Sequence, residues 1–281
     1  MTGFPLTLHD MKNRLPWWAK ILAKIIICRL PVSYALWRRL DLFRHGEMDD
    51  PAHAITVFRS HYERATALRP LREGFTMLEI GPGDSLFSAV IAKSFGAARS
   101  FLIDGGPFAR HNLAPYRALE AVLKAAGLCP LRLTGHTTIE EILTAVSGTY
   151  LTAGLESFAQ IEDHSVDFIW SNVALEHVAR PDFQPMVQEM RRVLKSDGVM
   201  SHSIDLRDHL QNSLNNLRFS EGIWESYLFR NSGFYTNRLR FHEILQIFED
   251  GGLQSKLVKM VHWDDLPLPR NKLARIIHGV A

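Results

Sequence analysis

From residue 75 onward, short apolar runs alternate with longer stretches in which apolar side chains recur at the helical spacing. A strand that reaches the next strand through a helix makes a crossover connection, so such strands lie parallel and helices cover both faces of the sheet. The runs predict strands at residues 75–80, 100–103, 149–152, 166–172 and 199–205. The sequence therefore predicts an α/β fold with a doubly wound, mostly parallel sheet.

The remaining elements divide the chain into an extension and a main domain. Helices are expected at residues 15–30, 34–45, 52–68, 115–126, 138–147 and 240–249, with others after Gly83 and Pro181, and a last strand at 256–263. We interpret residues 1–72 as a basic amphipathic helical extension and residues 73–281 as the main domain. Residues 207–238, rich in Asn, Arg and aromatic side chains, are interpreted as an insertion that caps a substrate.

A glycine turn follows the first predicted strand in the sequence LEIGPGDS. Gly81 and Gly83 allow backbone N–H groups to approach a ligand without an intervening Cβ, and the next helix presents its positive end. Ligands of doubly wound sheets bind beyond the carboxyl ends of the strands. A dinucleotide turn would need a third glycine at position 86, where this chain has Leu86, and no Lys-Ser/Thr pair marks a P-loop. A NAD(P)-linked oxidoreductase is therefore the least favoured alternative.

Four segments in order resemble class I S-adenosylmethionine (SAM)-dependent methyltransferases. They are LEIGPGDS, the acid Asp104 after the second strand, IEDHSVDFIWSNVALEHV and RRVLKSDGVM, and together they cover about residues 75–205. The full-length resemblance is to uncharacterised bacterial methyltransferases of this kind. It implies a Rossmann-like sheet of the seven-stranded type, SAM as cofactor and methyl transfer as the activity, although only one of the two usual antiparallel edge strands is evident.

The resemblance also implies a cofactor-binding set at the ends of the first four strands: Glu79, Gly81, Gly83, Asp84, Ser85, Asp104, Leu155, Glu156, Asn172 and Val173. The glycine turn and Glu79 would surround the methionine part, and Ser85, which stands where many members have glycine, would hold it through a hydroxyl. Asp104 would accept the ribose hydroxyls. Leu155 and Glu156 would contact adenine, and Asn172 and Val173 would line the sulfonium.

Three residues are candidates for catalysis: His177, His202 and Asp205. Methyl transfer to a hydroxyl needs an aligned acceptor and removal of its proton, for which histidine has a suitable pKa. His177 would be the base, or would only orient its loop. His202 and Asp205, with Asp208 and His209, could act as base, substrate ligand or metal site, or be surface polar residues. We predict no metal site, because spacing alone does not fix a coordination shell.

Several acceptor classes are disfavoured. The sequence SNVA replaces the Asn/Asp-Pro-Pro-aromatic turn of enzymes that methylate exocyclic amines of DNA, and neither cysteine follows the fourth strand. No dense basic face indicates nucleic acid. The most favoured activity is O-methylation of a small molecule: a sugar, a lipid-linked glycan or another metabolite. The alternative is a non-catalytic SAM-binding scaffold or a membrane-docked partner.

The N-terminal segment is basic and amphipathic. Residues 1–45 hold eight basic residues against two acids, and residues 15–30 read LPWWAKILAKIIICRL. A bilayer crossing needs about 20 apolar residues, so a transmembrane span is rejected. This helix either packs on the main domain over its substrate side or lies in a membrane interface. Only two cysteines and no evident cleavable signal peptide predict a cytoplasmic protein, and an interfacial helix would place it at the inner face of the membrane.

Overall fold

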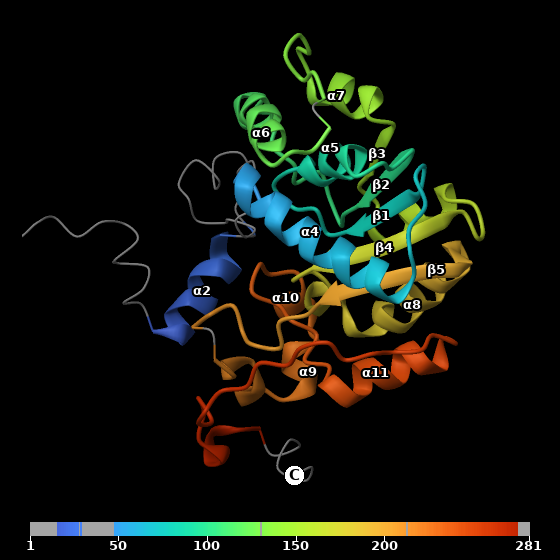
Figure 1. The fold of residues 1–281 in the computed structure, drawn as a ribbon. Coiled ribbons are helices and arrows are strands. Elements are labelled where there is room, and N and C mark those ends of the chain that lie inside the picture. The colour runs from blue at the N-terminus through green and yellow to red at the C-terminus, as the bar shows by residue number, and fades with distance from the viewer. Residues whose placement is uncertain (1–15, 28, 30–47, 130, 212, 275–281) are drawn as a thin grey trace, which may run out of the picture.

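A parallel β-sheet forms the centre of the protein, as the alternating pattern predicts (Figure 1). The computed structural model describes residues 16–27, 29, 48–129, 131–211 and 213–274. Within them the sheet has five strands in the order β3-β2-β1-β4-β5. The strands are β1 (Thr76–Ile80), β2 (Arg99–Ile103), β3 (Gly148–Leu151), β4 (Val166–Asn172) and β5 (Leu194–Ser203). Strand order reverses between β1 and β4, so the glycine turn after β1 lies at the switch point.

Helices cover both faces of the sheet. One face is covered by α4 (Pro51–Leu68), α5 (Phe87–Ser94), α6 (Ala114–Ala125) and α7 (Ile139–Ala145), whose apolar side chains share one core cluster with Met77, Leu102 and Phe168. The other face is covered by α8 (Arg180–Val193), α11 (Phe241–Asp250) and the 3₁₀ turn η1 (Gly154–Gln160), which share a second cluster with Leu78, Phe101 and Ile169. This three-layer arrangement confirms the predicted fold class.

Helix α4 belongs to the sheet layer, although its sequence lies in the predicted extension. Asp50 caps its first turn by accepting a hydrogen bond from the His53 N–H at 2.7 Å. Phe58 is fully buried, and its ring centroid lies 5.5 Å from that of Trp170 in β4. Figure 1 shows α4 lying across the sheet. The helix thus completes the core cluster on this face.

The chain between β5 and α11 forms a cap, defined here as residues 204–240. It contains η3 (Asn215–Arg218), α9 (Glu221–Trp224) and α10 (Tyr227–Arg230). Helix α2 (Trp17–Ile27) packs against it, with Ile21 buried in a cluster that includes Trp224 and Phe234. Lys20 and Lys24 donate hydrogen bonds to the carbonyls of Leu210 and Gly233, at 2.9 and 3.0 Å. Helix α2 is therefore held by the cap through both apolar and polar contacts.

Three expectations need correction or fall outside the described residues. Residues 256–263 form no strand, because they lie exposed and pair with no strand among the residues described; Val261 is 80% exposed. The seven-stranded count is likewise not found. The helix predicted at 34–45 lies outside the described residues. In the part of the chain that the structure describes, no helix has the length and apolar content that crossing a bilayer requires.

Candidate functional site

The turn after β1 has a backbone shape that favours glycine. Gly81 and Gly83 have φ angles of +75° and +66°, in the left-handed region. A Cβ on Gly81 would lie 2.4 Å from the Cβ of Ala174, which follows β4. The two loops at the carboxyl ends of β1 and β4 therefore pack directly together, and side chains at the first position of the turn are excluded.

Asp104 joins this turn to the end of β2. Its Oδ2 accepts a hydrogen bond from the Gly83 N–H at 3.0 Å, and its Oδ1 accepts one from the Gly105 N–H at 2.8 Å. A carboxylate offers about four acceptor positions. Asp104 therefore links the glycine turn to the end of β2 through both of its carboxylate oxygens.

Glu79 lies under the turn with a buried carboxyl group. It is 2% exposed, and the Ser88 hydroxyl donates a hydrogen bond to it from α5. Burial raises the pKa of Glu79 to about 8, the Ser88 hydrogen bond opposes this rise, and the nearby Asp104 charge adds to it. A cation bound above the turn would favour the ionised carboxylate.

Asp84 and Ser85 fasten the turn to other parts of the protein. Asp84 is buried and forms an ion pair with Arg110 at 2.8 Å, and Arg110 also pairs with Asp49 at 3.0 Å. The Ser85 hydroxyl donates a hydrogen bond to the Met48 carbonyl at 2.5 Å. These polar groups of Asp84 and Ser85 thus bind the protein itself, and the cofactor roles of the two residues stay a prediction. Sequence reasoning missed Arg110, which had no motif to mark it.

The remaining predicted cofactor residues follow β3 and β4. Leu155 is partly buried against the second core cluster, whereas Glu156 is exposed on η1. Asn172 ends β4. Val173 follows it with a φ of +53° and 40% exposure. A β-branched residue rarely adopts this conformation, and such strain gathers at functional sites. These positions border the same edge of the sheet as the glycine turn.

His202 is the next-to-last residue of β5 and pairs with Ser171 of β4. Its Nδ1 lies 2.8 Å from the Ser171 hydroxyl, and its ring centroid lies 5.6 Å from that of Phe248 in α11. Burial, with a smaller contribution from His61, lowers the pKa of His202 to about 3. His202 thus packs against α11 and stays neutral, and its role as base stays a prediction.

His61 is a buried histidine that sequence reasoning did not single out. Its Nδ1 lies 2.8 Å from the Ser201 hydroxyl and its Nε2 lies 3.3 Å from the Ser203 hydroxyl. Burial lowers its pKa to about 4, the Arg64 charge adds to this, and a hydrogen bond with Asn172 opposes it. His61 therefore connects α4 to the end of β4, where Asn172 lies. Its position on a helix assigned to the extension left no signal in the sequence.

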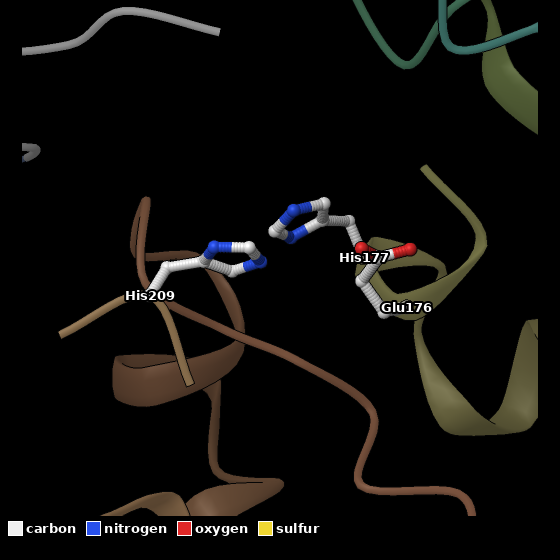
Figure 2. A group of neighbouring side chains, drawn as sticks. All are labelled: Glu176, His177 and His209. Atoms are coloured by element: carbon white, nitrogen blue, oxygen red, sulfur yellow. The ribbon is translucent and has the colours of Figure 1, made fainter. Parts of the chain in front are cut away.

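Glu176, His177 and His209 come together beside the ends of β4 and β5. Figure 2 shows Glu176 and His177 on the 3₁₀ turn η2 (Leu175–His177) and His209 opposite them on the cap. The rings of His177 and His209 stack with centroids 4.8 Å apart. The His177 Nδ1 lies 2.9 Å from the Tyr235 carbonyl, to which it donates. Burial raises the pKa of Glu176 to about 8 and lowers that of His209.

Asp205 and Asp208 shape the loop that carries His209. Burial alone would raise the pKa of Asp205, but hydrogen bonds from Arg207 outweigh it and lower the pKa. The Asp205–Arg207 ion pair has a distance of 2.7 Å. Asp208 is fully buried and accepts backbone hydrogen bonds from Leu210, Gln211 and Asn215. Asp205 thus holds this loop through its pairing with Arg207, and its catalytic role stays a prediction.

Part of the chain matches the model of a known protein family. Residues 78–201 match the model of the methyltransferase domain family. They are a class I SAM-dependent methyltransferase domain. The cofactor of the domain is SAM. The matched residues run from β1 to β5 and include the glycine turn, Asp104 and the η2 turn.

Solved structures similar to this methyltransferase include mitomycin 7-O-methyltransferase MmcR, with 14% identity, TM-score 0.45, and 92% of this chain and 68% of that chain covered. Another is the Haemonchus contortus phosphoethanolamine N-methyltransferase 2 in complex with phosphomonomethylethanolamine and S-adenosylhomocysteine. It has 20% identity and a TM-score of 0.39, and the match covers 66% of this chain and 35% of that chain. The Chlamydomonas reinhardtii arsenic(III) methyltransferase shares 15% identity, TM-score 0.39, and coverage of 83% and 61%. No curated protein matches the methyltransferase.

Proposed function

We propose that the methyltransferase transfers a methyl group from SAM to a hydroxyl oxygen of a small-molecule acceptor, such as a sugar, a lipid-linked glycan or another metabolite. The observation that carries this proposal is the group of Glu176, His177 and His209, whose η2 turn directly follows Ala174, the residue that packs against Gly81. Proton-accepting groups at this place suit a hydroxyl, whose proton must leave as its oxygen becomes a nucleophile.

The cofactor would lie over the carboxyl ends of β1, β2 and β4. The backbone of Gly81 and Gly83 would face the methionine part, and the Asp104 carboxylate would accept the ribose hydroxyls. Glu79 lies below the turn, and the positively charged methionine part of SAM would lie above it. Leu155 and Glu156 would border adenine, and Asn172 and Val173 would border the sulfonium.

In the reaction, the acceptor oxygen attacks the methyl carbon in line with the bond to sulfur. The C–S bond breaks, its electron pair goes to sulfur, and S-adenosylhomocysteine leaves as a neutral thioether. His177 would take the acceptor's proton. Because its Nδ1–H donates to the Tyr235 carbonyl, the ring lone pair lies on Nε2. The cap would exclude water and align the acceptor.

One observation supports a lipid-linked acceptor and a membrane-docked protein. Trp18, Leu22 and Ile26 lie on the outer face of α2, with exposed fractions of 54%, 54% and 60%. Such a stripe is typical of interfacial helices. The lysines of α2, Lys20 and Lys24, donate hydrogen bonds to the cap. Apolar insertion, rather than charge, would therefore carry this docking.

Two measurements test the proposed function. Calorimetry with S-adenosylhomocysteine should give one site per chain. A fractionated lysate supplied with methyl-labelled SAM should give a labelled product whose methyl ether survives mild base, unlike a methyl ester. Absence of cofactor binding would overturn the cofactor site. Label found only on nitrogen or carbon would overturn the hydroxyl acceptor.

A further inference from the structure

We infer that Glu176, His177 and His209 form a binding site for a divalent first-row transition metal such as Zn²⁺. Each side chain offers one ligand atom, and these three atoms all lie within 4.8 Å of one another. Figure 2 shows the three side chains converging from the η2 turn and from the cap. The site lies at the carboxyl ends of β4 and β5, beside the proposed position of the methyl group.

Two of the three side chains have a buried polar atom with no hydrogen-bond partner among the described residues. Glu176 is 2% exposed, and its Oε2 makes no hydrogen bond among the described residues. The buried Nε2 of His209 likewise has no hydrogen-bond partner in the described part of the chain. Such groups are costly to bury unless something binds them. A cation held between them would satisfy both.

The surrounding contacts orient these side chains as metal ligands are oriented in proteins. A ligating histidine typically donates its other ring N–H to a carbonyl or carboxylate, and His177 donates to the Tyr235 carbonyl at 2.9 Å. The Glu176 Oε1 accepts a hydrogen bond from the Asp205 N–H at 3.2 Å, which fixes the carboxyl group. Asp208 fixes the loop of His209 through backbone hydrogen bonds.

The donor set selects the class of metal. Two imidazoles and a carboxylate suit Zn²⁺, Co²⁺, Mn²⁺ or Fe²⁺, whereas Mg²⁺ and Ca²⁺ prefer oxygen ligands. Metal–ligand bonds of about 2.0–2.2 Å would bring the three atoms slightly closer than they now lie, which small side-chain rotations accomplish. Three protein ligands leave at least one position open, as in catalytic rather than structural zinc sites.

The role of the metal rests on the proposed function. A bound metal would also replace the role of base that the proposed function gives to His177. An acceptor hydroxyl bound at the open position would lose its proton to water more readily, because the cation stabilises the alkoxide. The alkoxide oxygen would then form the bond to the methyl carbon, while the C–S electron pair goes to sulfur. His177 would hold the metal with its lone pair and would not act as the base.

A cobalt titration tests the site independently of methyl transfer. The full chain, treated with a chelator and dialysed, is titrated with Co²⁺ and its visible d–d absorption is recorded. We expect one Co²⁺ per chain, displaced by one Zn²⁺. The variants Glu176→Gln and His209→Asn should bind at least about tenfold more weakly. His262→Asn, at an exposed histidine outside the cluster, is the matched control and should bind as the unchanged chain does.

The outcomes separate this inference from the proposed function. S-adenosylhomocysteine affinity is measured on the same samples. Cofactor binding without any cobalt binding by the unchanged chain would overturn the metal site and leave the methyltransferase proposal standing. Equal cobalt affinity in all variants would also overturn it. Should Glu176→Gln fail to fold, His209→Asn decides alone, because His209 lies on the cap and not in the sheet.

Discussion

The backbone N–H of Gly83 donates a hydrogen bond to the carboxylate of Asp104 at 3.0 Å, across the gap between β1 and β2. One side chain thus shapes the turn that is proposed to face the cofactor and also stands where the ribose is proposed to bind. A substitution of Asp104 should therefore lower the affinity for the cofactor more than it lowers the free energy of unfolding.

The variant Asp104→Asn tests this relationship. Hydrogen bonds to charged groups contribute about 1.5–3 kcal/mol, so S-adenosylhomocysteine affinity should fall by roughly 10–100-fold. Calorimetry measures it. Asp167→Asn is the matched control, because Asp167 accepts a bond from the Thr76 N–H at the opposite end of the strands. The control should lose stability and keep its affinity; equal affinity losses in both variants would contradict the assignment.

Gly81→Ala should abolish cofactor binding and destabilise the protein. The methyl group would meet Ala174, and the positive φ of Gly81 is strained for alanine by about 1–3 kcal/mol. Urea unfolding and calorimetry measure the two effects. Gly222→Ala has no heavy atom within 4 Å of its added Cβ and should leave both unchanged. Normal cofactor affinity in Gly81→Ala would count against the turn as the binding site.

Glu79 should release a proton when SAM binds near neutral pH. Its pKa is about 8 in the free protein, so below that pH the carboxyl group is mostly protonated. The ammonium and sulfonium charges of SAM favour the carboxylate, so affinity should rise with pH from about 6 to 8. Binding enthalpies in buffers of different ionisation enthalpy report the proton. Glu79→Gln should show no release, and release by this variant would assign the proton elsewhere.

His202 should weaken the fold at acid pH without serving the cofactor site. Its folded-state pKa of about 3 lies below the ordinary 6.5, so its contribution is complete above 6.5 and is lost as pH falls toward 3. At pH 5 the loss is on the order of 2 kcal/mol. His202→Gln should flatten this dependence in urea unfolding and retain cofactor affinity. Unchanged acid sensitivity of the variant, or loss of its cofactor affinity, would instead indicate that His202 acts in the functional site.

The outer face of α2 should decide whether the protein docks on lipid. Leu22→Ser with Ile26→Ser removes most of the exposed stripe but leaves the buried Ile21 in place. If the stripe inserts, flotation with anionic vesicles should recover the unchanged chain and much less of the double variant. Lys256→Ser with Lys259→Ser, at exposed lysines outside α2, controls for simple charge attraction. Recovery of neither protein would end the membrane proposal.

The sequence predicted those parts of the site that depend on local order along the chain. The glycine turn, Asp104 and Asn172 follow apolar runs directly, so the parallel topology alone brings them to one edge. Arg110 could not be found this way, because its ion pair with Asp84 depends on how a loop folds back. His209 and Glu176 meet only because the cap turns toward η2, and no periodic pattern specifies that turn.

Where sequence reasoning failed, the missing information was the environment of a side chain. Residues 256–263 have the composition of a strand, but a strand also needs a neighbour to pair with, and the described residues provide none. The bond from the Ser85 hydroxyl to the Met48 carbonyl joins residues 37 positions apart, and no local pattern indicates it. Successive side chains of β5 point to opposite faces of the sheet, and this alternation directs His202 toward Phe248.

The packing of α4 has a practical consequence for anyone who shortens this chain. Phe58 packs against Phe168 and Trp170 of β4, so a fragment starting at residue 73 would expose both of these rings to water. Expression of such a fragment should yield aggregates rather than a minimal enzyme. A shortened chain that folds should therefore start before Asp50, so that it keeps all of α4.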